Sequence, residues 1–350
     1  MKKYFALIAF ATSILFVFVL NFTLVQPLNA QSPEELKHKA KITVLNEQEV
    51  VVRVLEGKYK EREFKVLQFD RNQKEILGID LNDTVFVSIN ENNKTAFILD
   101  HFRLWPLILL TMIFIAFVVV IGRRKGFLSL LAMIISFFII IKAVIPQILL
   151  GNNPILISLL ASFFIIQFNF YFSHGISQKT TIAVLSTFIT LIITGVLSLI
   201  FVSLTKLTGF ASEEATFLSL QVGQAVDIKA LLLSGIIIGA MGVLDDITIS
   251  QASIVWKLKK ANPKYSRWEL FKESMDLGRD HIASLVNTLV LVYAGASLPL
   301  FVLFSSSQFG NFIQVVNMEI IATEIVRTLV SSIGIILAVP ITSYLSTYKR

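Results

Sequence analysis

The chain has 350 residues, of which 55% are hydrophobic and 16% charged, and its formal net charge is +7. A water-soluble domain cannot bury this much apolar surface, so the composition predicts a multi-pass membrane protein. Cysteine is absent, which excludes disulfides and cysteine-ligated metal centres. The lysines and arginines lie beside apolar segments, a pattern typical of membrane topology, and we therefore expect no nucleic-acid partner.

Residues 1–30 begin with two lysines and continue as a long apolar run. This pattern is typical of a signal peptide or an uncleaved signal-anchor helix, and the large side chain of Leu28 favours the anchor. Residues 31–100 contain short alternating runs such as KITVLN and DTVFVSI, separated by EGK, DRNQ and NENN. These runs predict an exported β-barrel or sandwich of about five strands.

Residues 101–350 are expected to form a membrane domain of about seven helices, which gives about eight spans with the N-terminal segment. The predicted fold class is therefore mainly α, a polytopic membrane helix bundle with a small extracytoplasmic β-domain. The expected spans are 104–121, 126–149, 154–173, 180–204, 230–254, 282–304 and 321–345.

The loops between these spans alternate in their content of lysine and arginine. This alternation places the C-terminus in the cytoplasm and residues 31–100 outside, in a bacterial plasma membrane. Residues 255–280 carry Trp256 and Trp268 among lysines, which predicts a cytoplasmic amphipathic segment at the membrane surface.

The stretch GAMGVLDDITISQAS, residues 239–253, places two adjacent acids inside an expected span. An aspartate at the bilayer centre costs about 2.5–3.5 kcal/mol on insertion scales, so Asp245 and Asp246 must face protein or water, or be protonated. Helical spacing places one stripe of residues on a single face: Gly239, Gly242, Asp246, Ser250 and Ser253. Three glycines are assigned to helix packing or a hinge: Gly235, Gly239 and Gly242.

The next span begins with GRDHIASLVNTL, and we expect its polar residues at the depth of the two aspartates. This depth of the membrane would then hold carboxylates, an imidazole, an amide and hydroxyl groups, which together are suited to bind a cation or a proton. The predicted substrate- or ion-binding residues are Asp245, Asp246, Thr248, Ser250, Asp280, His281 and Asn287. The alternative is that Arg279 neutralises one aspartate and links two helices.

The last expected span contains Glu324 and Arg327, which are three residues apart and are predicted to pair along the helix. Together with Arg279 they are candidates for structural or gating charges. Ser212 is predicted to cap a short helix that has Glu213 and Glu214 in its first turn. The histidines show no metal-ligand spacing, so we expect neither metal nor cofactor.

Three motifs in this order, GAMGVLDDITISQAS, GRDHIASLVNTLVLVYAGASLPL and EIVRTLVSSIGIILAVPIT, resemble the YibE/F-like membrane protein family. The resemblance extends over nearly all of the chain after Lys41, although relatives carry a glycine near Glu61 or Arg62 and this chain does not. It implies a multi-pass plasma-membrane protein of the kind usually regarded as a permease. It supplies neither a substrate nor functional residues.

The leading hypothesis is a permease or channel-like transporter for a small solute or ion, embedded in the lipid bilayer as a homo-oligomer or beside a paired membrane subunit. The alternative is an accessory or sensing protein whose exported β-domain binds an envelope ligand or partner. A membrane enzyme is a third interpretation. The chain contains no P-loop, H-E-x-x-H or G-x-S-x-G motif, which argues against the common ATPase, protease and hydrolase classes.

Overall fold

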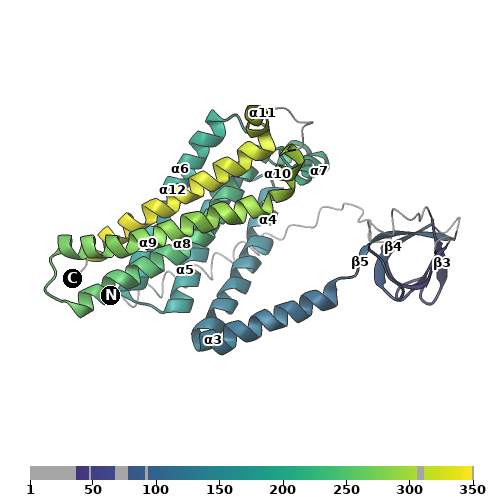
Figure 1. The fold of residues 1–350 in the computed structure, drawn as a ribbon, viewed down its shortest axis with the longest axis horizontal. Coiled ribbons are helices and arrows are strands. Elements are labelled where there is room, and N and C mark those ends of the chain that lie inside the picture. The colour runs from purple at the N-terminus through teal and green to yellow at the C-terminus, as the bar shows by residue number, and fades with distance from the viewer. Residues whose placement is uncertain (1–36, 47–48, 68–77, 91–93, 306–310, 349–350) are drawn as a thin grey trace. The chain divides into compact units, whose positions relative to one another are not determined.

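The structure, a computed structural model, describes residues 37–46, 49–67, 78–90, 94–305 and 311–348. Contacts divide the chain into two compact units, with the boundary between Ile121 and Gly122. The predicted N-terminal signal or anchor helix, residues 1–30, lies outside the described residues. The first unit contains a β-barrel and the second a bundle of helices (Figure 1).

The barrel consists of β1 (His38–Leu45), β2 (Val50–Val54), β3 (Glu63–Val66), β4 (Thr84–Asn90) and β5 (Thr95–His101). The strands close in the order β1-β2-β3-β5-β4. All neighbouring pairs are antiparallel except β3 and β5, which are parallel. The prediction of a small five-stranded barrel is confirmed, and the crossover makes it a Greek-key barrel.

The barrel encloses a core of its own because alternate residues of each strand point inward. Ile42, Val52 and Val87 are fully buried in this core. The turn before β3 places Glu61 at a φ of 63°, where a side chain is disfavoured. This is the region where the family resemblance leads one to expect glycine, which adopts such a conformation without strain.

The closed barrel is expected to fold without the helices. Residues 31–102 expressed alone should give a β-type circular dichroism spectrum and a single cooperative thermal transition, because the barrel core is formed only by barrel residues. A Val52→Asp variant should abolish the transition by burying a charge. A disordered spectrum for the wild-type fragment would contradict the prediction.

The second part of the chain is helical. Two of its helices contain the starts of the first two motifs that resemble the family: α8 (Ile228–Ala261) and α9 (Arg267–Ala296). The remaining elements are α3 (Leu104–Ile139), the π-helix η2 (Ile140–Val144), α4 (Ile145–Leu149), α5 (Pro154–His174), α6 (Gln178–Leu204), α7 (Glu213–Val222), the 3-10 helix η3 (Gly223–Ala225), α10 (Leu298–Ser305), α11 (Phe312–Val316) and α12 (Glu319–Tyr348).

Among the described residues, five helical segments are long and apolar enough to cross a membrane, or up to six if α9 and α10, bent by 64°, count as one span. The expectation of eight spans is not confirmed. One reason is that the expected spans 104–121 and 126–149 form a single helical run, Leu104–Leu149, interrupted at Arg123, which has non-helical dihedral angles. Residues 255–280 form the end of α8 and the start of α9, joined by a short loop.

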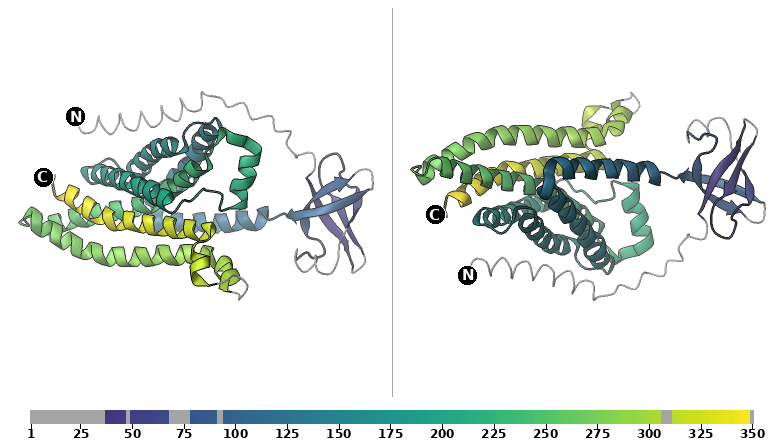
Figure 2. Two further views of the ribbon diagram at one scale, coloured as in Figure 1. Left: turned by 90° about the horizontal axis from the view of Figure 1, so that it is seen from above. Right: turned by 90° about the horizontal axis from the view of Figure 1, so that it is seen from below.

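The helices α6, α8 and α12 pack against one another, with α5 against α8 and α9 against α12 and α8 (Figure 2). Two glycines allow the close approach. A β-carbon at Gly334 of α12 would lie 2.5 Å from Oγ1 of Thr194 on α6, and one at Gly278 of α9 would lie 2.5 Å from Cγ1 of Val339. Small residues at such contacts are typical of membrane helices.

The face of α6 in this interface is a ladder of buried hydroxyl groups. Each hydroxyl of the ladder donates to the carbonyl four residues earlier in α6, so the ladder satisfies its own hydrogen bonds. The ladder consists of Ser186, Thr190, Thr194 and Ser198. These residues therefore serve close helix packing.

Candidate functional site

The site is organised by α8, whose N-terminus is capped by Asp227. The side chain of Asp227 accepts a hydrogen bond of 3.0 Å from the backbone N–H of Ala230. The helix ends at Ala261, before the Asn262-Pro263 pair that disfavours further helix. Both aspartates lie on this long helix, more than a turn from either end.

Asp245 is half-buried, and its Oδ1 atom is buried without a hydrogen-bond partner among the described residues. Its carboxyl group interacts with the side chain of Asn169 on α5. The Oδ1 atom of Asn169 in turn accepts a hydrogen bond of 2.9 Å from the hydroxyl of Ser136 on α3. Asp245, Asn169 and Ser136 thus form a polar cluster across three helices. Asn169 and Ser136 were not among the site residues predicted from the sequence.

Ser158 and Ser162 extend the polar character of α5 along the same helix face as Asn169, at steps of four and seven residues. Both hydroxyls are buried and have no partner among the described residues. The sequence shows the spacing of these serines. Because α5 contains no acidic residue, however, this spacing is also typical of small residues that only pack between helices.

Asp246 points to a different side of α8 and is exposed. Its charge interacts with His174 at the end of α5 and with His281 on α9. Of the predicted partners on α9, His281 is therefore brought near Asp246. Gly235, Gly239 and Gly242 also lie on exposed positions, and no described atom would lie within 4 Å of a β-carbon there. Their role in packing or as a hinge stays a prediction.

Two further polar residues of α8 hold neighbouring helices. The hydroxyls of Thr248 and Thr187 are 2.6 Å apart and join α8 to α6. The Nε2 atom of the buried Gln251 donates to the carbonyl of Ser274 at 2.7 Å and to Oγ of Ser343 at 2.8 Å. Gln251 therefore links α8 to α9 and α12, which is a structural role. Ser250 is half-buried between these positions.

Arg279 does not neutralise either aspartate in the structure. Its guanidinium pairs at 3.1 Å with Asp276, one turn earlier on α9, and both side chains are largely exposed. Asp280 and Asn287 are exposed as well. Of the α9 residues predicted to surround the aspartates, His281 interacts through its charge with Asp246, and Arg279 pairs with Asp276 instead. The joint site stays a prediction.

Two cavities lie at opposite ends of α8. The first, of about 320 Å³, adjoins Gly235 and the half-buried ion pair Glu324–Arg327, whose 2.7 Å separation confirms the predicted pairing. The second, of about 690 Å³, adjoins Ser253 and Trp256. The predicted cap of α7 is also confirmed, because Ser212 accepts from the backbone N–H of Ala215 beside the first cavity.

The apolar helices define a multi-pass membrane protein, and the described part of its bundle contains a partly buried polar cluster around Asp245. Residues 110–349 match the family described as YibE/F-like protein, so the chain belongs to this family and the resemblance is confirmed. The match begins within α3 and does not include the barrel. No curated protein and no solved structure matches the chain. The described residues contain no group of three side chains suited to hold a metal ion.

Proposed function

We propose that the helical unit is a permease for a small solute or ion and that Asp245 binds a proton or a cation during transport. The observation that carries this proposal is the carboxyl group of Asp245, which has one buried oxygen without a partner among the described residues and lies on α8 between the two cavities. A carboxylate in apolar helices is costly unless a proton or cation compensates it, and such groups commonly mark transport pathways. The protein is then a resident of a bacterial plasma membrane.

The spacing along α8 supports a transport path. Gly235 and Ser253, which line the two cavities, are separated by about 27 Å of helix at 1.5 Å per residue. This length approaches the roughly 30 Å thickness of the hydrocarbon core. Asp245 lies near the middle, about 15 Å from Gly235 along the axis. Transporters commonly hold their binding site near the midplane and open it alternately to either side.

The test is flux by the purified full-length protein in liposomes that contain a pH-sensitive dye. We expect proton movement above that of empty liposomes, either directly or when small cations and anions are offered one at a time with an imposed gradient. Liposomes that contain a heat-denatured sample serve as the control. Flux equal to that of empty liposomes for every ion offered would contradict the proposal.

The orientation proposed from the loop charges, with the C-terminus in the cytoplasm, has its own test. Ser212 precedes α8, Pro263 follows it, and both positions are exposed. A single cysteine at Ser212 should react with an impermeant maleimide in intact cells, whereas one at Pro263 should react only after lysis. The chain has no native cysteine to interfere. Labelling of Pro263 in intact cells would reverse the orientation.

A second candidate function, an accessory protein that binds an envelope partner, is favoured by one feature of the barrel. Phe97 and Leu99 project from the outside of β5 and are 38% and 44% exposed. Leu67 lies beside β5 and is 37% exposed. Replacement of Phe97 and Leu99 by serine should abolish capture of an envelope protein by the isolated barrel if this function is correct, and flux in liposomes should persist.

A further inference from the structure

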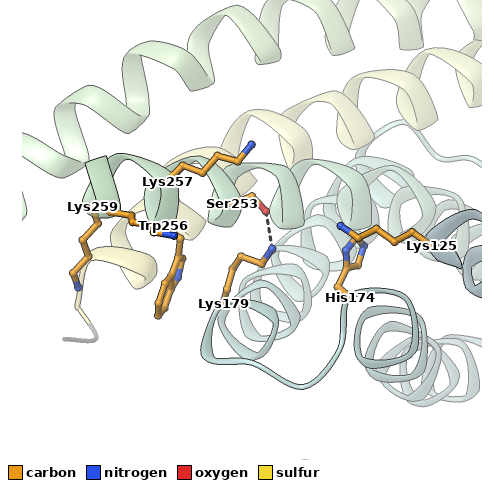
Figure 3. A pocket seen from close by; sticks show the side chains of 8 residues that line it. Lys125, His174, Lys179, Ser253, Trp256, Lys257 and Lys259 are labelled. Carbon is orange, nitrogen blue, oxygen red and sulfur yellow. Dashed lines mark hydrogen bonds between the residues drawn. The ribbon is translucent and has the colours of Figure 1, made fainter. Parts of the chain in front are cut away.

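The larger cavity, at the end of α8, has an unusual composition. Four helices contribute to it, and five of its eight lining residues are lysines: Lys125, Lys179, Lys257, Lys259 and Lys260. The others are His174, Ser253 and Trp256. Figure 3 shows Lys179 reaching from α6 towards Ser253 on α8, with Lys125 beside His174. Among the described residues no carboxylate lines the cavity, and the charge of Asp246 interacts with His174.

Lysines near the ends of membrane helices usually extend to water and separate from one another. In this cavity three of the five lysines, Lys125, Lys179 and Lys257, remain close enough for their charges to interact. Lys179 is half-buried, its Nζ donates to the hydroxyl of Ser253 at 3.1 Å, and Lys125 and Lys257 are near enough for their charges to repel it. Like charges gathered in a cavity of reduced dielectric repel unless an anion offsets them.

A second observation points to a ligand. The indole Nε1–H of Trp256 is buried and has no acceptor among the described residues. A buried donor without an acceptor is costly and is normally satisfied by protein, water or a ligand. An anion among the lysines would bring acceptor oxygens to the side of the cavity that Trp256 lines.

We propose that this cavity binds a phosphate group, carried either by the headgroup of an anionic lipid or by a soluble phosphorylated compound. Lysine is an effective phosphate ligand, and a tetrahedral anion has enough oxygens to accept from several ammonium groups and from the Trp256 N–H. Basic pockets between membrane helices on the cytoplasmic side are known to hold anionic headgroups. The inference does not depend on transport through Asp245.

The test uses the full-length protein with Trp105→Phe and Trp268→Phe, which leaves Trp256 as its only tryptophan. In detergent, inorganic phosphate is titrated against chloride at equal ionic strength. In nanodiscs, phosphatidylglycerol is compared with phosphatidylcholine. We expect phosphate, phosphatidylglycerol or both to shift Trp256 fluorescence and to raise the thermal midpoint. A response to free phosphate alone identifies a soluble ligand, and a response to phosphatidylglycerol alone identifies a lipid. No response to either overturns the proposal.

Matched variants distinguish the effect of the cavity lysines from the effect of lowering the net charge of the protein surface. Lys179→Gln with Lys257→Gln should abolish the response, whereas Lys264→Gln with Lys272→Gln, which removes the same charge from exposed positions outside the cavity, should leave it intact. Lys179→Arg with Lys257→Arg keeps the charge, controls for folding and should retain binding. Equal loss in the two glutamine pairs, or binding retained in the cavity pair, would show that the cavity is not the site.

Discussion

An Asp245→Asn protein is expected to accumulate in the membrane in normal amount and to lose flux in liposomes down to the level of empty liposomes. Asparagine keeps the size of the side chain and its contact with Asn169, but it cannot exchange a proton or offset a cation. No cation pairs with Asp245 among the described residues, so the substitution leaves no buried charge without its partner. Membrane abundance, elution volume in detergent and flux are the three measurements.

The controls for Asp245 come from the same region. Asp276→Asn removes an exposed acid that pairs with Arg279 and should leave flux unchanged. Asp246→Asn is expected to reduce flux less than Asp245→Asn, because Asp246 is exposed and has two histidines near its charge. If Asp245→Asn instead fails to accumulate and Arg279→Gln restores it, the acid is a structural partner of Arg279 and the transport hypothesis for this residue is wrong.

A Gly334→Leu protein is expected not to fold into a stable bundle. Even the β-carbon of alanine would lie 2.5 Å from Oγ1 of Thr194, and this contact joins two central helices, α6 and α12. Overpacking of this kind costs about 1–3 kcal/mol for small additions and more for large ones. Gly334→Ala should therefore lower the thermal midpoint measurably, and Gly334→Leu should leave little folded protein in detergent.

The control for Gly334 is Gly295→Ala, near the end of α9, where nothing lies within 4 Å of the added methyl group. Alanine is favoured over glycine in a helix by about 1 kcal/mol, so this variant should be unchanged or more stable. Thr194→Ala should rescue Gly334→Ala by removing the clashing oxygen. Full stability of Gly334→Leu would mean that α6 and α12 do not approach closely.

The barrel could be predicted well because its evidence is local. Alternation along KITVLN and DTVFVSI marks inward and outward residues directly, and turn-forming residues separate the runs. The parallel contact of β3 with β5 could not be predicted, because it depends on a crossover between segments that are distant in sequence. The segment that became β5, Thr95–His101, begins and ends with polar residues and was not among the runs that suggested strands.

The candidate site was predicted in part. Two acids in an apolar helix can be recognised in the sequence, and the structure buries one carboxyl oxygen of Asp245. The sequence placed Asp246 on a stripe with Gly239 and Gly242, and no described atom would lie within 4 Å of a β-carbon at these two glycines. Asn169 and Ser136 were missed because helical spacing relates residues within one helix and carries no information about which helices become neighbours.

The ladder of hydroxyls on α6 has a mechanical consequence. Each hydroxyl of the ladder donates its hydrogen bond to a backbone carbonyl within α6. The described residues therefore form no hydrogen bond between α6 and α12. At their direct interface, α6 and α12 are held by van der Waals contacts such as that of Gly334 with Thr194. Each helix is also hydrogen-bonded to α8, through Thr187–Thr248 and Gln251–Ser343, and these bonds limit how far α6 can slide along α12. Shear between packed helices is one of the two common ways in which domains rearrange. A small sliding movement of α6 along α12 would therefore let the bundle change its opening without losing a hydrogen bond between these two helices.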